Sequence, residues 1–164
     1  MSRRVAALTI VVGISFVATV STVVSQELIT QKALSIGMAQ TVAQGALEQC
    51  RADGYHVSVS VIDGSGLLKA FARDDGAGPG SIEVSRRKAY TALIFRRTSA
   101  ETAQAWATTA PVPNVEGTVA MGGGVPIRAG SEFIGAIGVS GAPDSAKDEA
   151  CANSGIAKVA NKLK

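Results

Sequence analysis

Two hairpin patterns limit the folds open to this chain of 164 residues. Residues 57–61 alternate between valine and serine, and a glycine-containing turn at 63–66 leads into a second run at 67–73. Two further apolar runs, 125–128 and 133–140, surround a short Ala-Gly-Ser turn. Strands joined by such short turns run antiparallel, because a parallel pair needs a crossover connection of about a dozen residues or more. A parallel α/β sheet is therefore not expected.

Helical patterns lie on both sides of these hairpins. Apolar side chains recur at helical spacing after Thr30, an expected N-cap, and Gly54 is the expected end of that helix. The expected elements are helices at about 30–53, 81–97 and 100–107, a short strand at 119–121, and a last helix in which Ser145 and Asp148 form a capping box. The run 133–140 is apolar on both faces and is expected at the centre of the sheet. The sequence predicts an α+β fold with an antiparallel sheet of about five strands flanked by helices.

Residues 1–25 are typical of a secretory signal. Two arginines precede an uncharged apolar run at 5–24, and small side chains follow. A retained membrane anchor is the alternative, because about 20 apolar residues can span a bilayer. We expect cleavage before Gln26. This would leave a single domain at 26–164 with no stable membrane span, in a secreted or periplasmic location.

The chain has two cysteines, Cys50 and Cys151. In an oxidising compartment such a pair suggests a disulfide bond. Cys50 lies near the end of the first expected helix and Cys151 in the first turns of the last. The two thiols meet if those helices pack antiparallel on one face of the sheet. Two buried free thiols are the alternative, and we expect the bond.

The charge balance argues against nucleic acid as a partner. The chain has 16 Lys plus Arg and 13 Asp plus Glu, with a net charge of +3. Two of the arginines belong to the expected signal, so the remaining body is close to neutral and has no strongly basic face. The one histidine excludes metal motifs that need several histidines.

No motif identifies a catalytic residue or a metal ligand. Neither glycine-rich stretch ends in the Gly-Lys-Ser/Thr of a phosphate-binding loop, and Ser140 departs from the spacing of a hydrolase nucleophile elbow. Two pairs of adjacent carboxylates, Asp74 with Asp75 and Asp148 with Glu149, are best interpreted as solvated turn and helix-start positions. An enzyme is therefore an alternative without assigned catalytic residues.

Three consecutive cations and three consecutive glycines are the main candidates for a ligand site. The candidate residues are Arg86, Arg87, Lys88, Gly122, Gly123 and Gly124. The cations could receive a carboxylate of a ligand, and the glycines would let a flat or anionic ligand approach the backbone closely. The alternatives are a solvated helix face, on which Glu83 pairs with Arg87, and a tight turn packed on the sheet.

His56 is a separate candidate. It precedes the alternating strand and lies on the face opposite the valines. A neutral imidazole in this position could hold haem iron or a metal, and a surface histidine at the start of a strand is the alternative.

Several segments together resemble the GlcG/HbpS family. The matching segments are 59–66, 73–77, 85–92, 122–127, 134–142 and 148–152. They run in the family's order from about Thr30 to the C-terminus. The resemblance implies a profilin-like α+β fold, assembly into homo-oligomers that are often octamers, and in some members haem binding, haem degradation or iron binding. It makes Thr98 a further candidate for the axial ligand, beside His56.

We therefore expect a secreted or periplasmic protein that binds a small ligand, with haem or a related tetrapyrrole or iron as the first choice. The alternatives are a binding or sensory module for another small organic acid and a haem-degrading enzyme.

Overall fold

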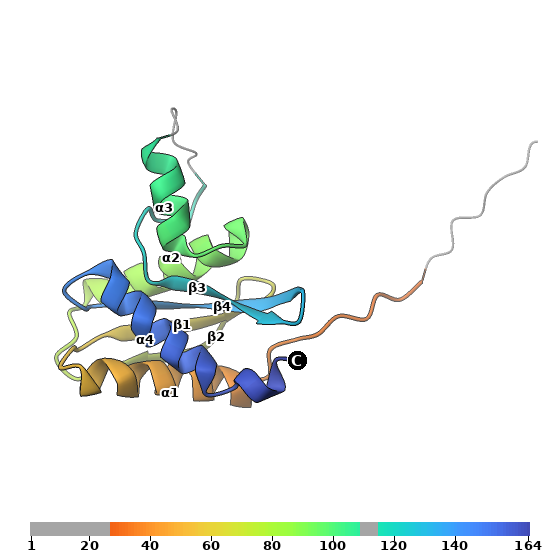
Figure 1. The fold of residues 1–164 in the computed structure, drawn as a ribbon, viewed down its shortest axis with the longest axis horizontal. Coiled ribbons are helices and arrows are strands. Elements are labelled where there is room, and N and C mark those ends of the chain that lie inside the picture. Colours follow the sequence, from red (N-terminus) through yellow and green to blue (C-terminus); the bar gives the residue numbers. More distant parts are fainter. Residues whose placement is uncertain (1–26, 109–114) are drawn as a thin grey trace, which may run out of the picture. The chain divides into compact units, whose positions relative to one another are not determined.

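The computed structural model describes residues 27–108 and 115–164, and the chain from residue 31 onward forms one compact unit (Figure 1). Its elements are α1 (Ile36–Ala52), β1 (Ser58–Asp63), β2 (Leu68–Arg73), α2 (Gly80–Phe95), α3 (Ser99–Ala107), β3 (Gly124–Ala129), β4 (Glu132–Ser140), α4 (Ser145–Ala157) and the 3-10 turn η1 (Ala160–Lys162). The expected secretory signal at 1–25 lies outside the described residues. None of the helices in the described ranges is long and apolar enough to cross a bilayer.

The first and last α-helices begin at other residues than expected. Ser35, not Thr30, caps α1, and its hydroxyl accepts the Met38 N–H. Asp144 caps α4, where a capping box of Ser145 and Asp148 was expected. The Asp148 side chain is turned into the interior and is not available to the helix start.

The sheet has four strands in the described residues, in the order β2-β1-β4-β3, and every neighbouring pair is antiparallel. The prediction of a mixed α+β fold with two hairpins is confirmed, as is the central place of β4. The prediction of about five strands is wrong. Residues 119–121 form no strand, because the backbone N–H and C=O of Val119 both bond the Thr91 hydroxyl on α2. This segment is tied to a helix and not to the sheet.

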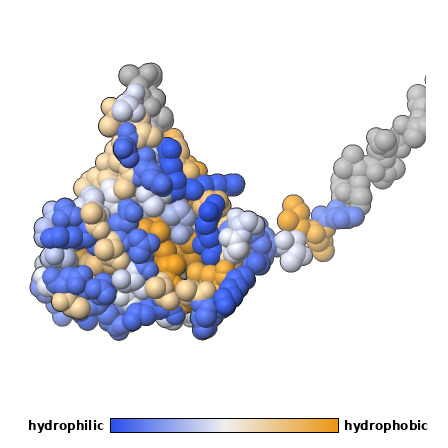
Figure 2. Space-filling view, in the orientation of Figure 1, coloured by the Kyte–Doolittle hydropathy of each residue, from blue (hydrophilic) through white to orange (hydrophobic). Residues whose placement is uncertain are grey.

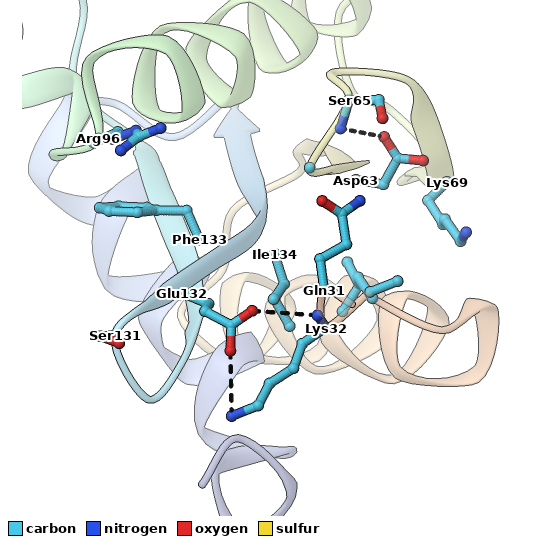
Figure 3. Close-up of a pocket in the computed structure, with 13 residues that line it drawn as sticks. Gln31, Lys32, Asp63, Ser65, Lys69, Arg96, Ser131, Glu132, Phe133 and Ile134 are labelled. Carbon is cyan, nitrogen blue, oxygen red and sulfur yellow. Dashed lines mark hydrogen bonds and ion pairs between the residues drawn. The ribbon is translucent and has the colours of Figure 1, made fainter. Parts of the chain in front are cut away.

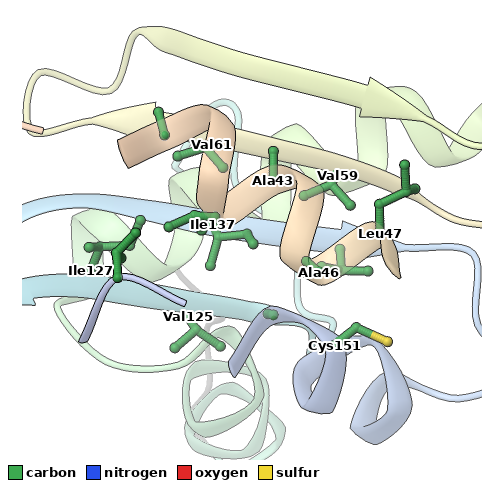
Figure 4. Close-up of a cluster of buried hydrophobic side chains, with 14 of the residues drawn as sticks. Ala43, Ala46, Leu47, Val59, Val61, Val125, Ile127, Ile137 and Cys151 are labelled. Atoms are coloured by element: carbon green, nitrogen blue, oxygen red, sulfur yellow. The ribbon is translucent and has the colours of Figure 1, made fainter. Parts of the chain in front are cut away.

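Helices α1 and α4 cover one face of the sheet and enclose a core of small apolar side chains (Figure 4). Val59 and Val61 point into this core from β1, and Ala43 and Ala46 meet them from α1. The expected disulfide joins these two helices. Cys50 of α1 and Cys151 of α4 are bonded, with their Cα atoms 5.5 Å apart.

Helix α2 covers the other face, so β1 is buried on both sides. The hydroxyls of Ser58 and Ser60 on β1 bond those of Ser81 and Ser85 on α2, each pair at 2.8 Å. A Cβ at Gly138 on β4 would collide with the Ser85 carbonyl oxygen. Small side chains thus bring the backbone of α2 directly onto the sheet. The Val-Ser alternation is typical of a strand with one buried side, but the serines of β1 face a helix and not solvent.

Candidate functional site

The glycine run leads into β3 and presses against α2. Gly124 donates its N–H to the buried Ser99 hydroxyl at 2.8 Å. A Cβ at Gly124 would collide with the Lys88 carbonyl oxygen, and one at Gly123 would lie 2.8 Å from the Cβ of Asp148. Gly123 also has a φ of 111°, which favours glycine. These glycines are therefore needed for close packing, whatever else they do.

Lys88 lies beneath this loop in a buried ion pair. Its ammonium is 2.7 Å from a carboxylate oxygen of Asp148, and both side chains are almost fully buried. The other Asp148 oxygen accepts the Ala142 N–H at 3.0 Å. Burial raises the pKa of Asp148, and the hydrogen bond and charge of Lys88 oppose that shift. The interpretation of Asp148 as a solvated helix-start residue is wrong, and the charge of Lys88 is already balanced within the protein.

Arg86 and Arg87 do not reach the glycine run or the Lys88–Asp148 pair. Both are exposed on α2, and both pair with Glu83, at 3.1 and 2.8 Å. Their hydrogen bonds lower the pKa of Glu83 to about 2. The pairing of Glu83 with Arg87 expected from the sequence is present. The structure thus brings Lys88 together with the glycine run and leaves the two arginines on the outer surface.

Two hollows flank the glycine run, and Met121 and Ser145 line both of them. The smaller one, of about 370 Å³, lies above the Lys88–Asp148 pair. The larger one, of about 720 Å³, lies between α3 and α4. Its apolar wall consists of Met121 and five alanines, namely Ala100, Ala103, Ala120, Ala146 and Ala150. The sequence reasoning missed this wall, although the alanines recur on each helix at the three- and four-residue spacing of one face.

Glu149 gives the larger hollow its carboxyl group. Its side chain lines that hollow and is half-buried. Burial raises the pKa of Glu149, against a hydrogen bond from the backbone of Gly123 that lowers it. The hollow therefore combines an apolar wall with three polar side chains, Ser145, Glu149 and Asn153, and the carboxyl group among them is partly withdrawn from water.

Thr98 serves as the N-cap of α3. Its hydroxyl accepts the Glu101 N–H at 3.1 Å, and the Glu101 carboxylate accepts the Thr98 N–H at 2.8 Å. This capping box occupies the Thr98 hydroxyl as an acceptor. Thr98 is not among the residues that line either hollow.

His56 belongs to a different cluster, at the end of the sheet where β1 begins. Its Nδ1 lies 3.2 Å from a carboxylate oxygen of Asp74, and the other Asp74 oxygen accepts two bonds from Arg51, at 2.8 and 2.7 Å. Asp74 is buried, and the Arg51 guanidinium holds its pKa below the ordinary range. The sequence did not predict this cluster, and its interpretation of Asp74 as a solvated turn residue is wrong.

The Asp74 cluster makes stability depend on pH. Because the folded pKa of Asp74 lies below its unfolded pKa, the folded state binds fewer protons between the two values, and stability falls as the pH drops through them. We expect the Asp74→Asn variant to be less stable than the wild type at neutral pH and to lose less stability on acidification below about pH 5. Urea unfolding at a series of pH values measures this. The exposed neighbour gives the control, because Asp75→Asn is expected to keep the acid dependence of the wild type.

No group of three or more histidine, cysteine or acidic side chains within 27–108 and 115–164 is arranged to hold a metal ion. The Nε2 of His56 has no hydrogen-bond partner among these residues. In the tautomer that donates from Nδ1 to Asp74, Nε2 is the acceptor, and a histidine ligand binds a metal through such a nitrogen.

The chain belongs to the family described as haem degrading protein HbpS-like, whose model matches residues 34–157. The resemblance to the GlcG/HbpS family is therefore confirmed. Protein GlcG of Escherichia coli (strain K12) is 31% identical over 117 residues, which cover 68% of this chain and 84% of that protein.

Two solved structures show the same fold. The crystal structure of HbpS matches with a TM-score of 0.77 and 36% identity, covering 82% of this chain and 97% of HbpS. The crystal structure of the PduOC:heme complex matches with a TM-score of 0.71 and 26% identity, covering 77% of this chain and 95% of PduOC.

Proposed function

We propose that this protein binds haem, or a related iron tetrapyrrole, in the larger hollow beside the glycine run. The observation that carries the proposal is an apolar hollow of about 720 Å³ in a chain of the HbpS-like family. The similarity to PduOC, whose crystal structure is that of a haem complex, supports the same ligand class.

The residues present fit such a ligand. Small-molecule sites are typically apolar clefts of about 300 to 1,000 Å³ with few polar groups. The alanine methyls of α3 and α4 offer an apolar surface without long side chains in the way. The Met121 thioether on the loop between them is one of the side-chain types that bind haem iron. When bound, haem would supply an iron centre for ligand or electron exchange.

Met121 is the axial candidate that lines the hollow, and 43% of its surface is exposed. His56 stays a second candidate because its Nε2 is free, and Thr98 a third, although its hydroxyl already caps α3. We expect Met121→Ala to change the absorption spectrum of bound haem, and His56→Ala and Thr98→Ala to leave it unchanged. A spectral change in either of the latter two variants, and none in Met121→Ala, would move the axial role to that residue.

Hemin titration of the purified protein tests the proposal, with a shifted and saturable Soret band as the expected result. Ala150→Trp would fill the hollow from an exposed position on α4, and we expect it to weaken hemin binding roughly tenfold or more. Ala157→Trp is the matched control, since it places the same ring on an exposed position of α4 that lines neither hollow. A flat titration, or equal loss in both variants, would contradict the proposal.

We also propose that the protein acts outside the cytoplasm. The apolar N-terminal run and the Cys50–Cys151 bond support this location, because disulfides persist in oxidising compartments. Cell fractionation with mass spectrometry should find the chain outside the cytoplasm and without residues 1–25, and a full-length chain in the cytoplasm would contradict the proposal.

We propose self-association through an apolar surface as well. Figure 2 shows apolar atoms gathered beside charged ones on the face that carries α4. Ile156 and Leu163 are packed against the core but only partly covered by it. A second copy of the same chain would cover such a surface with a matching one. Sedimentation should therefore give a mass well above the 16.6 kDa of one chain, and a monomer alone would contradict this.

A further inference from the structure

A third hollow, of about 480 Å³, shares no lining residue with those at the glycine run. Residues 31–34 before α1, the turn after β1 at 63–65 and the β3–β4 hairpin at 131–134 enclose it (Figure 3). Lys69 of β2 and Arg96 after α2 complete the wall. This hollow plays no part in the proposed haem site.

Positive charge exceeds negative charge in this hollow. Lys69 and Arg96 form no ion pair with any described carboxylate, whereas Lys32 pairs with Glu132. The carboxylate of Asp63 accepts two backbone N–H groups of the turn that follows it, at 2.9 and 3.1 Å. The hollow therefore holds three cations and two carboxylates, and Lys69 and Arg96 are its two cations without an ion-pair partner among the described residues.

Arg96 is held in an unusual backbone conformation. It ends α2 with a φ of 53°, and no other described residue besides glycines has a positive φ. Residues in this region concentrate at ligand-binding and other functional sites. The conformation places the Arg96 guanidinium 5.5 Å from the centre of the Phe133 ring, and Arg128 lies 3.9 Å from the same centre. Two positive charges share one aromatic ring, so an anion beside it would be attracted by both.

A smaller hollow of about 260 Å³ continues from this cationic one. Arg96 and Phe133 line both hollows, and so does the turn at 64–65. The additional wall consists of Tyr90, Leu93 and Ile94 on α2. The joined space thus has cations in one part and the side chains of Leu93, Ile94 and Phe133 in the other, which complements an organic anion with a ring.

We infer that this joined hollow binds a small organic anion. Arg96 and Lys69 receive its carboxylate or phosphate group, and its ring lies against Phe133 and the apolar side of α2. Guanidinium groups bind both anions with two parallel hydrogen bonds, so the shared chemistry is an oxyanion on an apolar body. This inference stands independently of the proposed haem binding.

Calorimetric titration with benzoate, phenyl phosphate and benzamide tests the inference. Benzamide has the same ring without the charge, and we expect it to bind at least roughly tenfold more weakly than the better of the two anions. Which anion binds more tightly distinguishes a carboxylate ligand from a phosphate ligand. Equal binding of benzamide, or no saturable binding of either anion, would overturn the inference.

Arg96→Gly separates binding from folding. Glycine adopts this backbone conformation without the penalty of a Cβ, so the variant is expected to unfold at no lower temperature than the wild type. It should nevertheless bind the better anion roughly tenfold more weakly, as should Lys69→Gln. Arg87→Gln, which removes one charge from the outer surface of α2, should bind it like the wild type.

Hemin binding is the second readout in these variants. We expect it to stay unchanged in Arg96→Gly, because the two hollows have no residue in common. Wild-type anion affinity in both Arg96→Gly and Lys69→Gln would overturn the assignment. So would an equal loss of affinity in Arg87→Gln, since bulk charge would then explain the effect.

Discussion

Lys88→Met should destabilise the protein by about 3 to 5 kcal/mol, the usual cost of removing one partner of a buried ion pair. The Lys88 side chain is 1% exposed and the Asp148 side chain 4% exposed, so water cannot replace the lost partner. Asp148 would then be a buried negative charge. Among the described residues, the backbone N–H of Ala142 would be the hydrogen-bond donor that it keeps. Urea unfolding at neutral pH, followed by circular dichroism, measures the loss.

The double variant Lys88→Met/Asp148→Leu provides the control. It removes both charges and is expected to recover most of the lost stability, because an apolar pair of similar volume often replaces a buried ion pair without cost. Acid should partly rescue the single variant. Burial raises the folded pKa of Asp148 above its unfolded value, so protonation favours the folded state as the pH falls. A double variant as unstable as the sum of the single variants would contradict this account.

Removal of the disulfide is the second change with a large expected effect. Cys50 and Cys151 are 101 positions apart. In the chain-entropy model, closing a loop of that length raises the free energy of the unfolded chain by roughly 4.7 kcal/mol. Measured losses of stability on removing a disulfide more often span about 2 to 5 kcal/mol. We expect Cys50→Ala/Cys151→Ala to lower the free energy of unfolding within this range. Denaturant unfolding of the oxidised wild type and the variant gives the difference.

A reductant provides the internal control for this prediction. Reduced wild-type protein is expected to unfold close to the double variant, and the reductant should leave the double variant unchanged. Equal stability of the oxidised wild type and the variant would show that the bond does not restrict the unfolded chain.

Patterns within one segment predicted most of the fold. The Val-Ser alternation at 57–61 and the turn after it specify a hairpin, because both depend on neighbours along the chain. The apolar run of β4 revealed its central position for the same reason. The strand expected at 119–121 failed because its backbone partner is Thr91, a hydroxyl on a helix 28 positions earlier. Local propensity carries no information about such a partner.

The candidate site was harder to predict because charge pairing is long-range. Lys88 follows two arginines, and all three are cations in one helical segment. Lys88 differs from them because it pairs with Asp148, 60 positions away. In the same way, nothing local separates the buried Asp74 from the exposed Asp75. Which acids and cations are free for a ligand depends on tertiary packing, so the sequence could identify the glycine run but not the charges that remain available.

The link between the first and last α-helices also has a consequence for how the chain is made. A polypeptide emerges from its N-terminus, so Cys50 appears 101 positions before Cys151, the thiol to which an external oxidant joins it. The bond can close only after Cys151 has been synthesised, and all four described strands precede that residue. Oxidation is therefore a late event in maturation, and it fixes α1 to α4 once the chain between them has been made.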